Sequence, residues 1–143
     1  MSCYTFELIG TNDSPVMNNV DCTYILTMED SSRVIDVENA QKFTRKTVKQ
    51  INKGFKKCHK ENVTHTGKDV IHAYRNIAET VLKSTDYERV LILEDDFIVM
   101  ETCDPCHYEE IDKFVSSNIC DLYSLGSLGI RIPFSIMLTL ITS

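Results

Sequence analysis

The chain has 143 residues, a length that fits one domain with one hydrophobic core. Its net charge of −6 argues against a nucleic-acid binder, because neutralising phosphates requires an excess of Lys and Arg on at least one face. Hydrophobic residues make up 43% of the sequence, and five glycines and three prolines are too few to indicate a disordered chain.

The first part of the chain predicts a starting segment, a polar loop and then a strand. Residues 4–9 form a short starting segment, residues 10–19 a loop, and residues 22–28 the first clear strand. Ser31 or Ser32 is the expected cap of a short helix that runs toward Phe43. A further strand is expected over residues 47–51.

The clearest element is an amphipathic helix over residues 68–84. Thr66 with Asp69 three residues later predicts a capping box at its start. Its expected apolar face, spaced by three and four residues, consists of Val70, Tyr74, Ile77, Ala78, Val81 and Leu82. The apolar run at residues 90–93 is continuous, which is typical of a strand covered on both faces by helices.

The last part of the chain predicts one more helix and further strands. Asp104 and Pro105 resemble an N-cap and first turn, opening a helix through Val115. Residues 119–125 predict a strand, and residues 130–142 are interpreted as a buried strand or an unusual end. Strands that alternate with helices predict an α/β layered fold with a mostly parallel sheet.

Residues 1–7 lack the basic start and apolar run of a secretory signal, so we expect a cytoplasmic protein. Its six cysteines are accordingly expected to be reduced thiols. The stretch 130–142 is shorter than the roughly 20 residues of a spanning helix, so no membrane span is expected.

Three acidic residues, Glu94, Asp95 and Asp96, follow the buried strand directly. The carboxyl end of a central strand is where open α/β sheets bind ligands. Because side chains alternate along a strand, Glu94 and Asp96 are expected on one side, as ligands of Mg²⁺ or Mn²⁺ that leave positions for a nucleotide diphosphate. The alternatives are an acidic strand end that meets solvent, or a phosphatase or receiver-like site, although those place their key aspartates earlier in the chain.

Two other patterns have both structural and functional interpretations. A basic cluster precedes the long helix and consists of Lys53, Lys56, Lys57 and Lys60. It is either a solvated face or the charge complement of a diphosphate. Cys103 and Cys106 form a Cys-x-x-Cys-His pattern, for which a loop with two thiols, a zinc site and redox chemistry are the alternatives.

Several segments carry a family resemblance through their order. They are residues 23–28 followed by Arg33, residues 52–58, the helix with His72, residues 90–97 (VLILEDDF) and residues 121–126. In this order they resemble glycosyltransferase family 25, the lipopolysaccharide and collagen glycosyltransferase-like group, including its relatives in large DNA viruses. The resemblance covers residues 22–126 and leaves residues 127–143 as a divergent tail.

The resemblance implies a fold and a function. It implies one GT-A-like, Rossmann-like domain over residues 1–143, located in the host cytoplasm if the chain is viral. The activity would be metal-dependent transfer of a sugar from a UDP- or GDP-linked donor to a hydroxyl of a glycan or protein acceptor. Family members continue further after the acidic motif, so the acceptor half is expected to be incomplete.

The resemblance also implies roles for particular residues. Glu94 and Asp96 would contact Mn²⁺ or Mg²⁺ and the diphosphate, Asp95 would shape the donor pocket, and Arg33 and His72 would be donor-side residues. No catalytic base is assigned. The alternative is a catalytically inactive remnant that acts as a nucleotide-binding or protein-interaction module, and an uncovered sheet edge would favour homo-oligomers.

Overall fold

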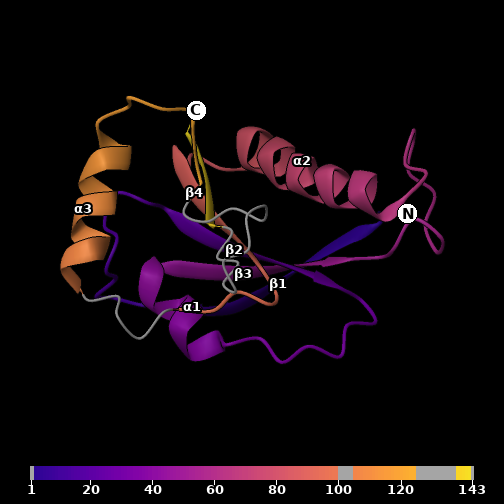
Figure 1. The fold of residues 1–143 in the computed structure, drawn as a ribbon, viewed down its shortest axis with the longest axis horizontal. Coiled ribbons are helices and arrows are strands. Elements are labelled where there is room, and N and C mark those ends of the chain that lie inside the picture. Colours follow the sequence, from indigo (N-terminus) through magenta and orange to yellow (C-terminus); the bar gives the residue numbers. More distant parts are fainter. Residues whose placement is uncertain (1, 100–104, 125–137, 143) are drawn as a thin grey trace, which may run out of the picture.

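The structure is a computed structural model that describes residues 2–99, 105–124 and 138–142 (Figure 1). Its helices and strands follow one another in the order β1 (Tyr4–Thr11), β2 (Cys22–Met28), α1 (Val37–Phe43), β3 (Lys46–Asn52), α2 (Thr66–Ser84), β4 (Arg89–Glu94), α3 (Pro105–Ser116), β5 (Leu122–Ser124) and β6 (Leu138–Thr142). The expected α/β architecture is therefore confirmed.

The described strands form one six-stranded sheet with the order β1-β3-β2-β4-β6-β5. The central strands β3, β2 and β4 are parallel, because α1 and α2 supply the crossover connections that parallel neighbours need. β1 is antiparallel to β3, and β6 lies antiparallel between β4 and β5. The sheet is thus mixed, which corrects the expectation of a mostly parallel one.

Helices cover both faces of the sheet, with α2 on one side and α1 on the other (Figure 1). Side chains of β4 alternate between two apolar clusters: Val90 and Ile92 pack under α2, whereas Leu91 and Leu93 pack with residues of α1 and α3. All four are buried, and burial of one such side chain contributes about 1.5–3 kcal/mol. The prediction of a strand covered on both faces is confirmed.

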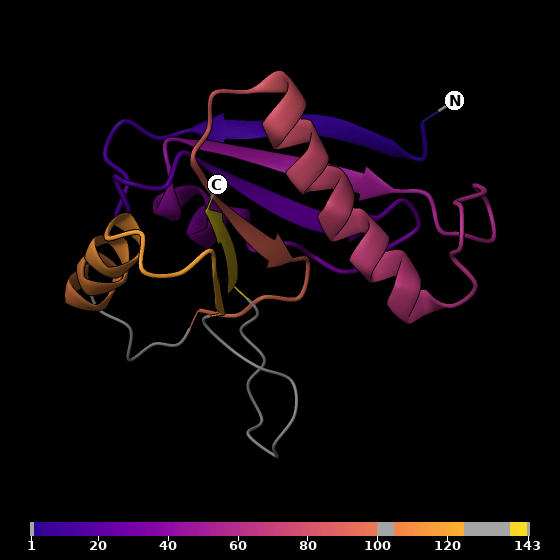
Figure 2. The ribbon, with the colours of Figure 1, turned by 90° about the horizontal axis from the view of Figure 1, so that it is seen from above.

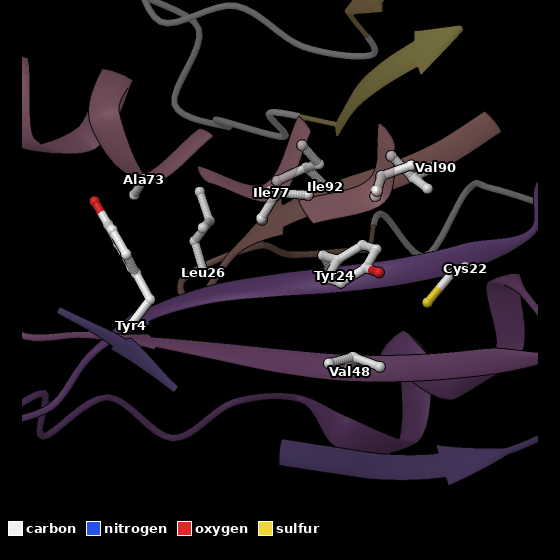
Figure 3. Packing of buried hydrophobic residues seen from close by; sticks show 10 residues of the cluster. Tyr4, Cys22, Tyr24, Leu26, Val48, Ala73, Ile77, Val90 and Ile92 are labelled. Carbon is white, nitrogen blue, oxygen red and sulfur yellow. The ribbon is translucent and has the colours of Figure 1, made fainter. Parts of the chain in front are cut away.

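The cluster beneath α2 joins the helix to three parallel strands. Ala73 and Ile77 of α2 lie over Tyr24 and Leu26 of β2, with Val48 of β3 beside them (Figure 3). The helix is oblique to the strands (Figure 2). This packing fixes the first half of α2 beside the ends of β2, β3 and β4.

The start of α1 differs from the prediction. Its N-cap is Asp36, whose carboxylate accepts a hydrogen bond from the Asn39 amide at 3.1 Å. Ser31 and Ser32 do not cap this helix. The Ser31 hydroxyl instead donates to Asp95 at 2.9 Å, and the helix begins six residues later, so Ser31 is not at the N-cap position.

The long helix α2 differs in its cap and in its buried face. His65 is the N-cap and accepts from the Lys68 amide at 3.4 Å, so the expected capping box of Thr66 and Asp69 is wrong. The buried residues recur every four positions and are Asp69, Ala73, Ile77 and Val81. Leu82, expected on the apolar face, is 70% exposed. The buried face was not predicted correctly because it includes an acidic residue, Asp69, and a small one, Ala73.

Cys3 and Cys58 are joined by a disulfide, which corrects the expectation of reduced thiols for this pair.

The strand expected over residues 119–125 is shorter, and β6 occupies the last part of the stretch 130–142. Asp104 and Cys103 lie outside the described residues. Within the part of the chain that is described, no helix is long and apolar enough to cross a membrane.

Candidate functional site

A pocket of about 750 Å³ lies at the carboxyl ends of β2, β3 and β4, beside the first half of α2. Figure 2 shows the arrowheads of β3 and β4 at the end of the sheet where α2 begins. The carboxyl edge of parallel strands is the usual ligand site of such sheets, and the volume lies within the roughly 300–1,000 Å³ of small-molecule sites. Its walls come from the loop after β2, the segment after β3, α2 and the acidic end of β4.

Asp95 is the most strongly bonded residue of the acidic end. Its side chain is 6% exposed, and its Oδ2 accepts hydrogen bonds from the hydroxyls of Thr27 and Ser31, both at 2.9 Å. Its Oδ1 accepts from Arg33 Nη1 at 2.7 Å. These bonds tie the end of β4 to the end of β2 and to the loop that follows it. Asp95 therefore shapes the pocket rather than pointing openly into it.

Arg33 links the loop after β2 to two carboxylates. Its Nη1 lies 2.7 Å from Asp95 and 3.6 Å from Asp96 Oδ2, while its side chain remains 59% exposed. The pKa of the guanidinium is raised, first by the hydrogen bond to Asp95 and then by the charges of both aspartates. A cation that is permanently charged and open to solvent is well placed to contact an anionic ligand.

Glu94 is the last residue of β4, whereas Asp95 and Asp96 lie in the turn that follows it. β4 ends at Glu94, and the amide of Phe97 donates to the Glu94 carbonyl at 3.1 Å, which closes a turn over Asp95 and Asp96. The alternation expected from strand geometry therefore stops at Glu94. The turn brings all three carboxylates into the lining of one pocket.

The two candidate metal ligands have different surroundings. Glu94 Oε1 accepts a hydrogen bond from the Tyr74 hydroxyl at 3.1 Å, whereas Asp96 is 53% exposed. Within residues 2–99, 105–124 and 138–142, no group of three or more His, Cys, Asp or Glu side chains is arranged to hold an ion. A cation bound at Glu94 and Asp96 would therefore have to complete its coordination with ligand phosphates and water, as Mg²⁺ can.

His72 lies outside this pocket lining. Its Nδ1 is 2.6 Å from the Tyr4 hydroxyl, and the two rings are stacked with centroids 5.8 Å apart. The structure therefore brings together four of the five candidate residues, Arg33, Glu94, Asp95 and Asp96, and places the fifth against β1.

The opposite wall of the pocket is basic. Gly54, Phe55, Lys56 and Lys57 contribute to it. Lys57 Nζ lies 3.1 Å from Asp30, and this hydrogen bond, followed by the lysine charge, lowers the pKa of the Asp30 carboxyl. Two members of the expected basic cluster thus face the pocket.

Lys60, another member of the cluster, is neither on a solvated face nor at the pocket surface. Its ammonium is buried and forms an ion pair with Asp69, with further bonds to Asn52 Oδ1 at 2.5 Å and the Lys53 carbonyl at 2.7 Å. It also lies 5.0 Å from the centre of the Tyr4 ring. Burial with this many partners gives Lys60 a structural role.

Several residues that build the pocket were not expected from the sequence: Thr27, Asp30, Ser31, Asn52, Phe55, Asp69 and Tyr74. Asp69 had a detectable signal, because it stands four residues before Ala73 and eight before Ile77, on the inner face of the helix. An acidic residue at such a position indicates a buried partner. No comparable signal marks the hydroxyls of Thr27 and Ser31.

Comparisons of the chain with models of protein families, with curated proteins and with solved structures gave no match. The class of site therefore follows from its own residues: a strand-end pocket in a mixed α/β sheet, with a carboxylate cluster facing two lysines.

Proposed function

We propose that the pocket binds the nucleotide part of a sugar donor and that the chain is a GT-A-type glycosyltransferase, related to family 25. The observation that carries the proposal is the convergence of Arg33, Asp95 and Asp96 at the end of the central strand. Residues 62 and 63 positions apart in the chain meet there, in a pocket large enough for a nucleotide.

The acidic and basic residues of the pocket would bind different parts of the ligand. Asp96, with Glu94 beside it, would hold Mn²⁺ or Mg²⁺ against the diphosphate, and Arg33 would contact the same phosphates. Such a cation offsets the negative charge that develops on a departing diphosphate. Lys56 and Lys57 on the facing wall add the positive potential that attracts an anionic ligand.

Asp95 acts through position in this proposal. Its three bonds hold the end of β4 against the loop that carries Ser31 and Arg33, so the guanidinium is preorganised before the ligand arrives. The sugar would then pass to an acceptor hydroxyl of a glycan or a protein. UDP and GDP are the two donor nucleotides to be tested.

A second candidate is a nucleotide-binding module without transfer activity. It is favoured by the absence of a three-ligand metal cluster in the described part of the chain and by the complete engagement of the Asp95 oxygens. Both candidates predict nucleotide binding at the same pocket. They differ in whether a sugar is released or transferred.

Calorimetric titration of UDP and then GDP, with and without Mn²⁺, tests the binding step. Asp96→Asn should weaken Mn²⁺-dependent binding by about tenfold or more, because it removes a charged ligand from the site. Asp86→Asn is the matched control, since Asp86 is an exposed aspartate between α2 and β4 that is not part of the pocket lining. Absence of binding by both nucleotides, or equal binding by Asp96→Asn, would reject the proposal.

If binding is found, the second step is a donor assay. Release of UDP or GDP from a nucleotide-sugar, dependent on Mn²⁺ and on Asp96, supports an enzyme. Tight binding without release, across a panel of acceptors, supports the binding module instead.

A further inference from the structure

One wall of the pocket is an irregular segment that is fastened to the amino terminus. This segment, residues 53–60, connects β3 to α2 and has no helix or strand of its own. We propose that the Cys3–Cys58 disulfide is a redox-sensitive fastening of this wall, so that its reduction weakens ligand binding in the pocket. The identity of the ligand in this inference rests on the proposed function. The loosening of the wall on reduction does not depend on it.

The disulfide is the covalent part of the fastening. Cys58 lies within the segment, and Cys3 directly precedes β1, 55 positions earlier in the chain. The Lys53 amide also donates to the Cys3 carbonyl at 2.9 Å, so the segment is attached to Cys3 at two points. A covalent link across this distance in sequence removes much of the conformational freedom that the segment would otherwise have.

The segment faces the pocket between these attachments. Gly54, Phe55, Lys56 and Lys57 line it. The Phe55 amide donates to Asp69 Oδ2 at 3.0 Å, and Lys57 contacts Asp30 across the pocket edge at 3.1 Å. The position of both pocket lysines therefore depends on how firmly this segment is held.

Apart from the disulfide and the contacts of Phe55 and Lys57, the described part of the chain shows only one turn in the middle of the segment. Its internal bonds are those of one turn, from the amides of Lys57 and Cys58 to the Gly54 carbonyl at 2.8 and 3.0 Å, and the bond from Lys60 Nζ to the Lys53 carbonyl at 2.7 Å. The buried Lys60 fixes the far end through Asp69 and Asn52, but it lies beyond the pocket-lining residues. If the reduced segment adopts the wall conformation about one tenth of the time, the apparent Kd rises about tenfold.

The chemistry requires a thiol reductant of the dithiol class. A thiolate attacks one sulfur of the Cys3–Cys58 bond, and a second thiol of the same reductant resolves the mixed disulfide. The protein gains two electrons and two protons as two thiols, and the reductant becomes a disulfide. Cys3 and Cys58 are both partly exposed, so a small dithiol can reach them.

The test compares oxidised protein with protein reduced by dithiothreitol. Calorimetric titration with UDP and GDP, in the presence of Mn²⁺, should give a Kd about tenfold higher for the reduced protein. A Cys3→Ser/Cys58→Ser variant should bind weakly whether or not the reductant is present. Cys106→Ser is the control for loss of a thiol outside the pocket lining, and it should retain the difference between the two states.

Amide hydrogen exchange measures how often the wall opens locally, and it needs no ligand. On reduction, exchange at Phe55, Lys57 and Cys58 should become faster, while exchange in β4 stays slow because the core is unchanged. Equal exchange in both states would overturn the inference, whatever the nucleotide results. If exchange is faster in the reduced protein but neither nucleotide binds, the disulfide holds the wall and the proposed function is rejected. If exchange is faster in the reduced protein but both states bind the nucleotide with equal affinity, the disulfide does not control binding and the inference is overturned.

Discussion

The carboxylate of Asp95, at the end of β4, accepts a hydrogen bond from Arg33 Nη1 at 2.7 Å, although the two residues are 62 positions apart. This hydrogen bond joins the loop after β2 to the end of the neighbouring strand β4. It also explains why the loop after β2 can form one side of the pocket.

Asp95→Asn should reduce the free energy of unfolding by about 1–3 kcal/mol, because two hydroxyls and a guanidinium lose a charged acceptor. Urea denaturation measures the change. Asp86→Asn, at an exposed position, should stay within about 0.5 kcal/mol of the parent chain. Equal stability of the two variants would show that Asp95 does not hold the pocket together.

The buried Lys60–Asp69 ion pair predicts a larger effect. Lys60→Met should cost about 3–5 kcal/mol, because it leaves the Asp69 carboxylate buried without its cation. The double variant Lys60→Met/Asp69→Leu should recover part of this loss, although the Phe55 amide then loses its acceptor. Lys56→Met is the exposed control, and a similar cost for Lys56→Met and Lys60→Met in urea denaturation would contradict this assignment.

Alkaline stability follows from buried thiol and phenol groups. Burial raises the pKa of Cys22 from 9.0 to about 12, and burial also raises the pKa values of Tyr4 and Tyr24. The folded state therefore holds these protons more tightly than the unfolded state, and the free energy of unfolding should fall as pH rises from 9.0 toward about 12.

Urea denaturation across this pH range measures that slope. Cys22→Ala should make the fall less steep, since it removes one of the groups responsible. Absorbance titration should show Tyr4 and Tyr24 ionising at a higher pH than a free tyrosine, whose pKa is 10.0. Stability that is constant or rising over the range would be inconsistent with these buried groups.

The two pocket lysines should affect binding rather than folding. Lys56→Ala/Lys57→Ala should weaken nucleotide binding by about fivefold, equivalent to about 1 kcal/mol, because both side chains are exposed and screened. The effect should shrink at high salt. Lys83→Ala/Lys113→Ala, at two exposed sites outside the pocket lining, is the control for net charge. Identical affinities of the two variants at low salt would rule out a role for this wall.

Much of the fold could be predicted because local patterns dominate its centre. β2 matches its predicted bounds, and β4 exceeds them by one residue at each end, since both are apolar runs bounded by polar residues. The placement of Glu94, Asp95 and Asp96 at the end of a central strand follows from the same pattern. The position of β6 between β4 and β5 was not predictable, because pairing partners distant in sequence leave no local signal.

The site was less predictable because its bonds are long-range. The partners of Asp95 depend on where the loop after β2 returns, and Thr27, Ser31 and Arg33 lie more than 60 positions from Asp95 in the chain. Lys60 resembles its exposed neighbours in the sequence, and only the inward direction of Asp69 distinguishes it. The disulfide likewise depends on β1 lying beside β3, which brings Cys3 close to the segment 53–60.

The most direct test of the proposed donor site is to locate Mn²⁺ in the presence of UDP by paramagnetic broadening of amide signals. Broadening should be strongest for Asp96 and its neighbours, extend to Ser31 and Lys57, and disappear in Asp96→Asn while remaining in Asp86→Asn. These residues surround the pocket and come from three separate segments of the chain. Broadening centred elsewhere, or none at all with UDP present, would contradict the account.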